Sequence, residues 1–500
     1  MTDRRVARAL TAAVVAASVL GLPSPIARAQ SEPWTSPYPL ILTPERAFAF
    51  AQAADKDLDY VPGEVIVKFR DGVSAIGQTR ALQAIRDQPL PGNLRWFGDV
   101  ALLRDGREFN ARILADQLST QPEVEYAEPN YLYRLTATPN DPSFSARQWN
   151  FRVLDLPRAW DINPGATGQF IVAVIDTGIT TVNQSFTFAT WNGTGVQTIS
   201  VPFAVNPDLS AGRLTASRDF AFWGGPVLDM VGHGTHVSAT IGEDTNNNLA
   251  EAGIAYNVKI MPLKACLGFW EVQFQYSGGG MRGSVPLDSG GCPSDAIAQA
   301  IVYAADNGAK VINLSLGSEF RSTLLSNAMQ YAVSKGVFIA ISAGNEKEEG
   351  NPVEYPAAYA ATLDGAMAVG AVGTSLTRAY YSNTGSYIEI VAPGGDVRDG
   401  GTAGLIWQTT ISQTDLNERA VTFPRFDRYV ETPLQGTSMA APHVAGTAAL
   451  IMSRGVVDPA AVEALIKATA RDLGATGRDD DYGFGLVQPR ATLFGFGVAK

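Results

Sequence analysis

The sequence is poor in histidine, cysteine and charge, and each shortage excludes a class of protein. Three of its 500 residues are histidine and two are cysteine. Two cysteines are too few for a disulfide-rich scaffold or for a structural zinc site. Charged residues make up 17% and hydrophobic residues 46%, so the chain is neither disordered nor a coiled coil. The net charge of −11 argues against nucleic acid or an anionic membrane as a partner.

Long apolar runs are also lacking after residue 29, since none approaches the roughly 20 residues that a membrane-spanning helix needs. Near the amino terminus, Arg4, Arg5 and Arg8 precede a shorter apolar run at residues 9–22, and Ala27-Arg28-Ala29 follows it. This is the pattern of a secretory signal peptide and its cleavage site. We therefore expect residues 1–29 to be removed and the product to be secreted, either extracellular or in transit through a periplasm. A membrane anchor is the alternative, which the short run disfavours.

Residues 30–138 predict a linker followed by a small α+β unit. Residues 30–60 are rich in proline and alanine and have no clear period. Beyond them, hydrophobic periodicity predicts one helix, at 109–119, and strands at 63–69, 94–97, 100–104 and 124–135. The turn-rich segment Thr-Ala-Thr-Pro-Asn-Asp-Pro then predicts the boundary with a larger domain, residues 139–500.

Strands and helices alternate in this larger domain. Short, nearly continuous apolar runs are typical of strands buried on both faces of a parallel sheet. Such runs occur at 170–175, 311–316, 337–342 and 366–372. Amphipathic patterns predict helices at 294–307, at 323–335 and from Asp458-Pro459 onward. The domain is therefore expected to be α/β, an open and mostly parallel sheet with helices on both faces.

Three segments of the larger domain carry side chains suited to nucleophilic catalysis. Asp176 directly follows the run 170–175, and open α/β sheets place reactive groups just beyond the carboxyl ends of strands. His233 lies in Gly-His-Gly-Thr-His-Val, and Ser438 lies in Gly-Thr-Ser-Met-Ala-Ala-Pro-His-Val-Ala-Gly. A serine hydroxyl needs a base within hydrogen-bond reach, and that base needs a carboxylate to orient it. The other two histidines, His236 and His443, are expected to be structural.

In this chain order, the three segments resemble the active-site motifs of the subtilisin-like serine proteases, the subtilases. The order Asp, His, Ser is the one already known for subtilisin. The resemblance implies that Asp176 orients the imidazole, that His233 is general base and then general acid, and that Ser438 is the nucleophile. Asn345, in the motif Ala-Gly-Asn, resembles the family's oxyanion donor, which is usually worth about 3–4 kcal/mol of barrier.

The resemblance also implies a cleft for polypeptide substrates. Residues 312–317, Ile-Asn-Leu-Ser-Leu-Gly, resemble the segment that pairs with an extended peptide and forms one wall of the S1 pocket. Glu354 aligns near the base of that pocket, where a carboxylate favours Lys or Arg at P1. A surface glutamate is the alternative. The residues expected to bind substrate are Ser315, Leu316, Gly317, Ala343, Gly344 and Glu354.

Calcium is the cofactor that the resemblance implies, because many subtilases hold this ion in the loop after the histidine helix. Asp208, Asn247 and Leu249 stand at matching positions, and Asp141 is a further candidate ligand. Ala250 replaces the usual glycine of that loop, so a solvated polar turn is the alternative.

The unit at residues 63–135 resembles the subtilase propeptide, a ferredoxin-like module that assists folding and blocks the cleft until it is cut away. An independent binding domain is the alternative. Arg134, at the end of this module, would suit self-cleavage after a basic residue.

Three stretches depart from the family pattern. Residues 181–205 and 268–291 are insertions, and residues 396–429 are a variable stretch. Cys266 and Cys292 bracket the second insertion, and in an oxidising compartment we expect them to form a disulfide. We expect this insertion beside the cleft, where it would restrict or extend substrate contacts.

These features lead to one main hypothesis and two alternatives. The main one is a secreted, monomeric serine endopeptidase that activates itself by removing its own propeptide, an intramolecular inhibitor. The first alternative is a processing protease whose inserted loops make its specificity narrow. The second is a catalytically dead subtilase fold used for binding. That alternative requires the loss of a catalytic residue, whereas Asp176, His233, Ser438 and Asn345 are all present.

Overall fold

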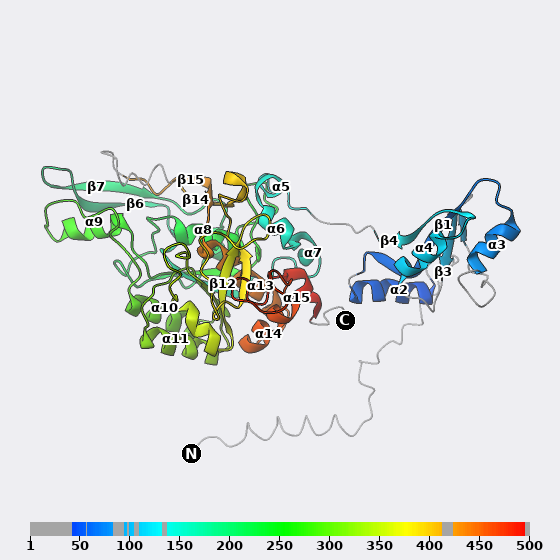
Figure 1. The fold of residues 1–500 in the computed structure, drawn as a ribbon. Coiled ribbons are helices and arrows are strands. Elements are labelled where there is room, and N and C mark those ends of the chain that lie inside the picture. The colour runs from blue at the N-terminus through cyan, green and yellow to red at the C-terminus, as the bar shows by residue number, and fades with distance from the viewer. Residues whose placement is uncertain are drawn as a thin grey trace, which may run out of the picture. The chain divides into compact units, whose positions relative to one another are not determined.

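A computed structural model describes residues 43–56, 58–83, 95–97, 100–104, 110–132, 138–412 and 424–495. The predicted signal peptide at residues 1–29 and the proposed cleavage residue Arg134 lie outside the described residues, as does part of the stretch 396–429. The chain divides into two compact units, residues 1–133 and 134–500 (Figure 1).

The first unit is a four-stranded antiparallel sheet with helices packed against it. Its elements are α2 (Pro44–Asp55), β1 (Tyr60–Phe69), α3 (Ala75–Gln83), β2 (Arg95–Phe97), β3 (Val100–Arg104), α4 (Ala111–Ser119) and β4 (Val124–Tyr131). The strands follow the order β2-β3-β1-β4. Since α3 connects β1 to β2 and α4 connects β3 to β4, this is the predicted ferredoxin-like topology.

The linker prediction is wrong for residues 44–55, which form α2. This segment, Pro-Glu-Arg-Ala-Phe-Ala-Phe-Ala-Gln-Ala-Ala-Asp, has proline at its first helical position and alanine through its interior, both favourable for a helix. The helix packs on β1, and Ala53 is fully buried. Alternating alanine with phenylalanine gives only a weak helical period, which is why the sequence pattern did not reveal it.

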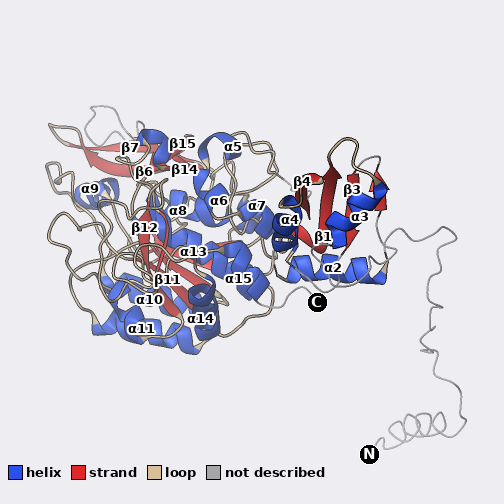
Figure 2. Cartoon of the chain, turned by 45° about the vertical axis from the view of Figure 1, so that its right-hand side comes forward, coloured by secondary structure: helices blue, strands red, loops and turns tan. Residues whose placement is uncertain are grey.

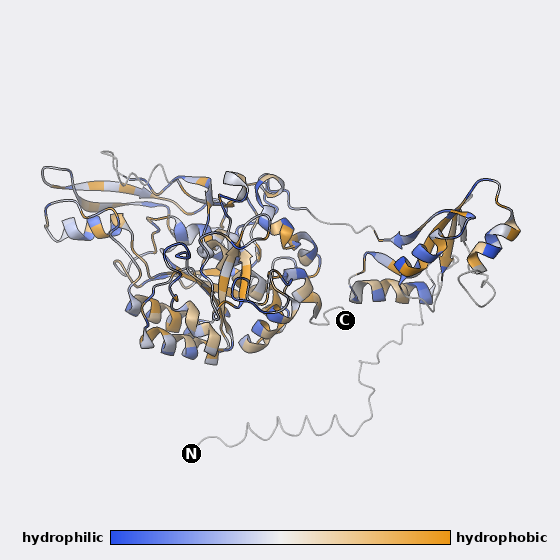
Figure 3. Cartoon of the chain, viewed as in Figure 1, coloured by the Kyte–Doolittle hydropathy of each residue, from blue (hydrophilic) through white to orange (hydrophobic). Residues whose placement is uncertain are grey.

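A seven-stranded sheet forms the centre of the second unit, and every neighbouring pair of its strands is parallel. The order across the sheet is β13-β12-β11-β10-β5-β9-β8. The bounds are β5 (Ile171–Asp176), β8 (Arg218–Asp219), β9 (Lys259–Lys264), β10 (Val311–Leu314), β11 (Phe338–Ser342), β12 (Ala366–Val372) and β13 (Ile390–Pro393). The predicted parallel sheet is confirmed, and Figure 3 shows hydrophobic residues concentrated on its central strands.

Helices cover both faces of this sheet (Figure 2). Val172 and Val174 of β5 share a buried cluster with α8 (His233–Gly242) and α13 (Thr437–Met452). The alternate residues Ala173 and Ile175 share a second cluster with α10 (Ser294–Asp306) and α11 (Thr323–Ser334). Successive side chains of a strand point to opposite faces, so the two helix layers lie on opposite sides of the sheet. Further elements are α5 (Phe144–Arg147), α6 (Trp149–Val153), α7 (Leu156–Trp160), β14 (Ile406–Ile411), β15 (Tyr429–Leu434), α14 (Pro459–Thr469) and α15 (Pro489–Gly495).

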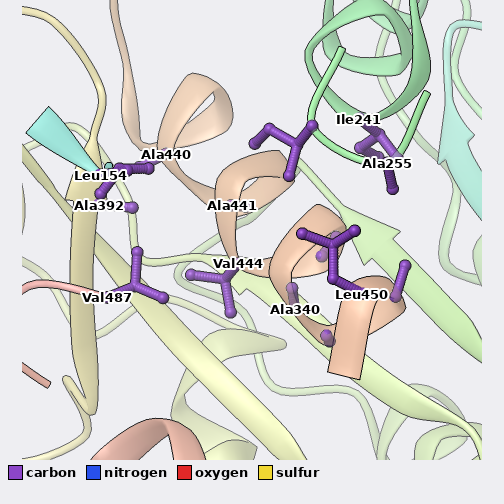
Figure 4. Packing of buried hydrophobic residues seen from close by; sticks show 14 of the residues in the cluster. Leu154, Ile241, Ala255, Ala340, Ala392, Ala440, Ala441, Val444, Leu450 and Val487 are labelled. Atoms are coloured by element: carbon purple, nitrogen blue, oxygen red, sulfur yellow. The ribbon is translucent and has the colours of Figure 1, made fainter. Parts of the chain in front are cut away.

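Helix α13 runs through the interior, and almost every residue in it is buried. Its Val444 and Leu450 pack in the cluster that contains Ala340 of β11 (Figure 4). Ser438, the second residue of the helix, is only partly buried although its neighbours Thr437 and Met439 are buried. The core therefore fixes the helix and leaves this one hydroxyl accessible at its start.

The two insertions form one structure, which we call the insertion lobe (residues 181–205 and 268–291). The first insertion is a hairpin of β6 (Gln184–Trp191) and β7 (Val196–Phe203), and the second contains α9 (Phe269–Gly278). Phe188 of the hairpin stacks on Phe274 of α9 with ring centroids 4.5 Å apart. The disulfide predicted between Cys266 and Cys292 is present at the base of the second insertion.

Candidate active site

The carboxylate of Asp176 and the imidazole of His233 are hydrogen-bonded. Asp176 is the last residue of β5 and is 1% exposed, and His233 is the first residue of α8. The Nδ1 atom of His233 lies 2.8 Å from Oδ1 of Asp176, which also accepts the backbone N–H of Thr177 at 2.7 Å. This bond holds the proton on Nδ1 and leaves Nε2 free to act as a base. The His233 side chain is 29% exposed, so a substrate can approach it.

A second carboxylate, Asp229, supports the start of α8 and was missed by the sequence reasoning. It is fully buried and accepts backbone N–H bonds from Gly232 at 2.8 Å and Thr235 at 3.1 Å. Burial by itself would lower the pKa of His233, but the charges of Asp176 and Asp229 outweigh it and raise that pKa. An aspartate shortly before a helix is a typical capping signal, and this could have identified the residue.

The other two histidines are buried and neutral. His236 Nε2 lies 3.1 Å from the carbonyl oxygens of Ile406 and Thr432, whereas His443 Nδ1 donates to the Met439 carbonyl at 2.8 Å. Burial lowers the pKa of His236 to about 3 and the pKa of His443 to about 4. Both are fully buried, so His233 is the one histidine in the sequence that solvent can reach.

Ser438 is held at the amino-terminal end of α13 by contacts with Ser315. The Ser438 hydroxyl donates to the Ser315 carbonyl at 3.3 Å, and the Ser315 hydroxyl donates back to the Ser438 carbonyl at 2.8 Å. Within the described residues, the hydroxyl therefore bonds to Ser315, and no hydrogen bond joins it to His233. Catalytic hydrogen bonds in enzymes without substrate are often unformed in this way.

The side chain of Asn345 is held against the start of α13 by its amide oxygen. Its Oδ1 accepts the backbone N–H of Thr437 at 2.8 Å and the Thr437 hydroxyl at 3.0 Å. A Cβ placed at Gly436, where φ is +151°, would lie 3.7 Å from both Asn345 Nδ2 and the backbone N of Ser438. The same Cβ would lie 3.7 Å from Asn345 Oδ1 as well, so the side-chain amide of Asn345 and the backbone N–H of Ser438 lie beside the same position.

Two of the predicted substrate residues, Gly317 and Gly344, lie against Glu354. A Cβ at Gly317 would lie 2.8 Å from Oε2 of Glu354, and one at Gly344 would lie 2.4 Å from its Cγ. Ser315 and Ala343 are buried, Leu316 is half-buried and Gly317 is exposed. Glu354 itself is 5% exposed, which contradicts the alternative of a surface glutamate.

The Glu354 carboxylate lies in an acidic environment. Burial raises its pKa to about 7, and the charges of Glu346 and Glu319 add to this increase. Among the described residues, no lysine or arginine forms an ion pair with Glu354. A cation brought in by a ligand would therefore meet an uncompensated carboxylate at this position.

The candidate calcium ligands lie together at the loop after α8. Asp141 accepts the backbone N–H groups of Asn246 at 2.9 Å and Asn247 at 3.3 Å, and Asp208 accepts the Asn247 side-chain amide. Burial raises the pKa of Asp208 to about 7, and its Oδ2 is buried without a hydrogen-bond partner among the described residues.

This donor set fits a calcium ion, since a cation would satisfy the orphaned oxygen of Asp208. No three His, Cys, Asp or Glu side chains of the described chain are grouped to hold a metal, so amide and backbone oxygens, including the carbonyl of Leu249, would complete the shell.

The parallel sheet and this site together define a serine protease of the α/β class. The chain belongs to the Subtilase family, whose profile matches residues 167–485. Residues 46–130 match the Fervidolysin N-terminal prodomain, so the first unit is a propeptide domain rather than an independent binding module. Subtilases commonly bind calcium.

Three similar proteins illustrate this membership. A thermophilic serine proteinase from Bacillus sp. (strain AK1) is 34% identical over 85% of this chain and 86% of its own length. An extracellular protease from Xanthomonas campestris pv. campestris is 32% identical over 82% of this chain and 68% of its own length. The solved structure of a protease from Pseudoalteromonas arctica PAMC 21717 is 29% identical, with a TM-score of 0.52 over 73% of this chain and 100% of its own. None of the described helices has the length and apolar character needed to cross a membrane.

Proposed function

We propose that the chain is the precursor of a secreted, monomeric serine endopeptidase that cuts polypeptides through an acyl-enzyme. The observation that carries this proposal is the 2.8 Å bond between Asp176 and His233, the one accessible imidazole. In this proposal residues 1–29 are the signal peptide, residues 30–138 the linker and propeptide, and residues 139–500 the catalytic domain. The name of the Xanthomonas relative supports an extracellular location.

The proposed reaction uses each side chain of the site in turn. Nε2 of His233 removes the Ser438 proton as Oγ attacks the substrate carbonyl carbon, and the carbonyl oxygen becomes an oxyanion. Asn345 Nδ2 and the backbone N–H of Ser438 donate hydrogen bonds to that oxyanion. His233 then gives its proton to the leaving amine, which breaks the peptide bond and leaves an acyl-serine. Water, deprotonated by the same imidazole, releases the acid and regenerates Ser438.

We also propose that the propeptide inhibits its own catalytic domain until it is cut away. This rests on the prodomain match at residues 46–130 and on the fold of the first unit, which has a core of its own. The second candidate is a narrow-specificity processing protease in which the insertion lobe restricts the substrates. It predicts slow cutting of casein beside rapid cutting of one particular sequence.

The S1 position of Glu354 predicts cleavage after Lys or Arg. In a peptide mixture analysed by mass spectrometry, we expect basic residues to dominate P1, and this preference to strengthen from pH 6 to pH 8. The preference for basic residues rises with pH because the pKa of Glu354 is about 7. Its carboxyl group is mostly neutral below that pH and mostly charged above it.

Replacing Glu354 with glutamine should lower kcat/KM for peptides with P1 Lys or Arg by at least about tenfold, since a buried charge pair loses several kcal/mol when one partner is removed. Glu349→Gln, at an exposed position on the same loop, is the matched control. A preference for large apolar P1 residues in the unaltered protein would show that Glu354 does not set specificity.

Calcium bound by Asp141, Asp208, Asn247 and the carbonyl of Leu249 would stabilise the folded protein. Ligand at 100 times its dissociation constant stabilises by about 2.7 kcal/mol, so removing it with EGTA should lower Tm by roughly 5 °C. Excess calcium should restore Tm, and excess magnesium should not. Asp208→Asn should remove the difference between the EGTA and calcium samples. If EGTA leaves Tm of the unaltered protein unchanged, the ion does not occupy this loop.

A further inference from the structure

Thr177, the residue after Asp176, is held by hydrogen bonds to four other residues. Its backbone N–H donates to the Asp176 carboxylate at 2.7 Å. Its hydroxyl donates to Asp229 at 3.0 Å and accepts the backbone N–H of Gly234, in the first turn of α8, at 2.8 Å. Its carbonyl accepts the ammonium group of Lys264 at 2.6 Å. The orientation of the Asp176 carboxylate relative to α8 therefore depends on where Thr177 is held.

The ammonium group that reaches Thr177 is part of a buried ion pair. Lys264 and Glu271 are both fully buried, and Lys264 Nζ lies 2.8 Å from Oε1 of Glu271. The other carboxylate oxygen of Glu271 accepts the backbone N–H of Gly268 at 3.0 Å. Lys264 ends β9 directly beside Asp176 in the sheet register, whereas Glu271 belongs to α9 of the insertion lobe.

The base of the second insertion is attached to the same turn. The backbone N–H groups of Ala265 and Cys266 both donate to the Asp176 carbonyl, at 2.9 and 3.1 Å. Cys266 forms the disulfide with Cys292 that closes the insertion. The backbone, the disulfide and the ion pair thus all connect the inserted segment to Asp176 and Thr177.

We propose that Glu271 is a positioning residue for catalysis, acting through Lys264 and Thr177 to fix the Asp176 carboxylate against His233. Stability alone does not explain this pair, because an apolar pair of similar volume often replaces a buried ion pair without loss. An apolar side chain at position 264, however, has no donor for the Thr177 carbonyl. In this proposal the second insertion helps to position the Asp176 carboxylate. This inference rests on the proposed function of Asp176 and His233.

The isosteric variant Glu271→Gln tests the proposal by two measurements. With peptide substrates, kcat should fall between about tenfold and hundredfold with KM unchanged, because small displacements of catalytic groups have effects of this size. In a Ser438→Ala background, histidine-labelled NMR should show a lower pKa for His233 and an upfield shift of its Nδ1 proton. Both follow from a weaker bond to Asp176. The buried His236 and His443 serve as internal references, and Asp288→Asn, at an exposed carboxylate of the same insertion, is the matched control.

A second variant keeps the proposal testable if Glu271→Gln does not fold. Lys264→Met combined with Glu271→Met replaces the ion pair by apolar side chains. Because the Thr177 carbonyl and the Gly268 N–H lose their partners, Tm should fall by a few degrees, but the variant should fold and show the same loss of kcat. Full kcat in this variant, or an unchanged His233 pKa in Glu271→Gln, would overturn the proposal. Failure of the proposed function has a different result, because the unaltered protein would then cut no peptide. The His233 pKa could still be compared by NMR with and without Glu271→Gln.

Discussion

Replacing Ser438 with alanine should lower kcat about 10⁶-fold, which is the magnitude known for loss of the nucleophile in subtilisin. In the proposed mechanism the serine hydroxyl supplies the atom that attacks the substrate carbonyl, and alanine has no substitute for it. The variant should retain its fold, because Ser438 is only partly buried and its side chain makes its hydrogen bond to the Ser315 carbonyl, an acceptor that water can satisfy. Initial rates on a peptide that the unaltered protein cuts would measure the loss.

The same variant separates self-activation from cleavage by other proteases. Intact mass spectrometry of Ser438→Ala should show the propeptide still attached, whereas the unaltered protein should have lost it. His233→Ala should reduce kcat to a similar extent, and the double variant should be no slower, because the two residues act as one unit. Retained proteolysis in Ser438→Ala would mean that another residue is the nucleophile.

Asn345→Ala should lower kcat by about 10²–10³-fold with little change in KM, equivalent to about 2.7–4 kcal/mol of transition-state stabilisation. In the proposed mechanism the Asn345 amide donates to the substrate carbonyl oxygen as that oxygen becomes charged, so its contribution belongs to the transition state. In the same proposal the backbone N–H of Ser438 remains as the second donor, and the activity left in the variant is attributed to it. Steady-state kinetics on one peptide would separate the effects on kcat and KM.

The control for this substitution must account for the bonds between Asn345 and Thr437, which alanine also removes. Thermal unfolding of Asn345→Ala should show whether the start of α13 is destabilised. Asn327→Ala, at an exposed position on α11, gives the effect of the same change away from the site. If kcat of Asn345→Ala stays within a factor of two or three of the unaltered value, the oxyanion would have to be stabilised by other groups.

The sequence predicted four of the seven strands of the large sheet, β5, β10, β11 and β12, because they are buried on both faces and form nearly continuous apolar runs. It did not predict β8, β9 or β13. It also predicted Asp176, His233 and Ser438, because each lies in a short motif whose glycines and small residues surround it in the chain. The hairpin of the first insertion was not predicted, although Phe186 and Phe188 alternate with threonines before the turn signal Asn192-Gly193.

The supporting contacts of the site could not be predicted in this way. Thr177 joins Asp229 and Lys264, which are far apart in the chain, and Lys264 reaches it only because β5 and β9 are neighbours in the sheet. Glu271 adds a residue from an insertion whose position no local pattern determines. Such hydrogen-bond networks depend on tertiary packing. A single sequence contains the residues of the network but does not show that they are in contact.

The stacking of Phe188 on Phe274 has a consequence for the evolution of the two insertions. The two insertions enter the chain far apart, yet each covers the aromatic face of the other. A descendant that lost one of them would expose large aromatic rings of the other to water, an arrangement prone to aggregation. The two segments are therefore expected to be inherited together, and a protein engineer who transplants the lobe to another subtilase would need to move both.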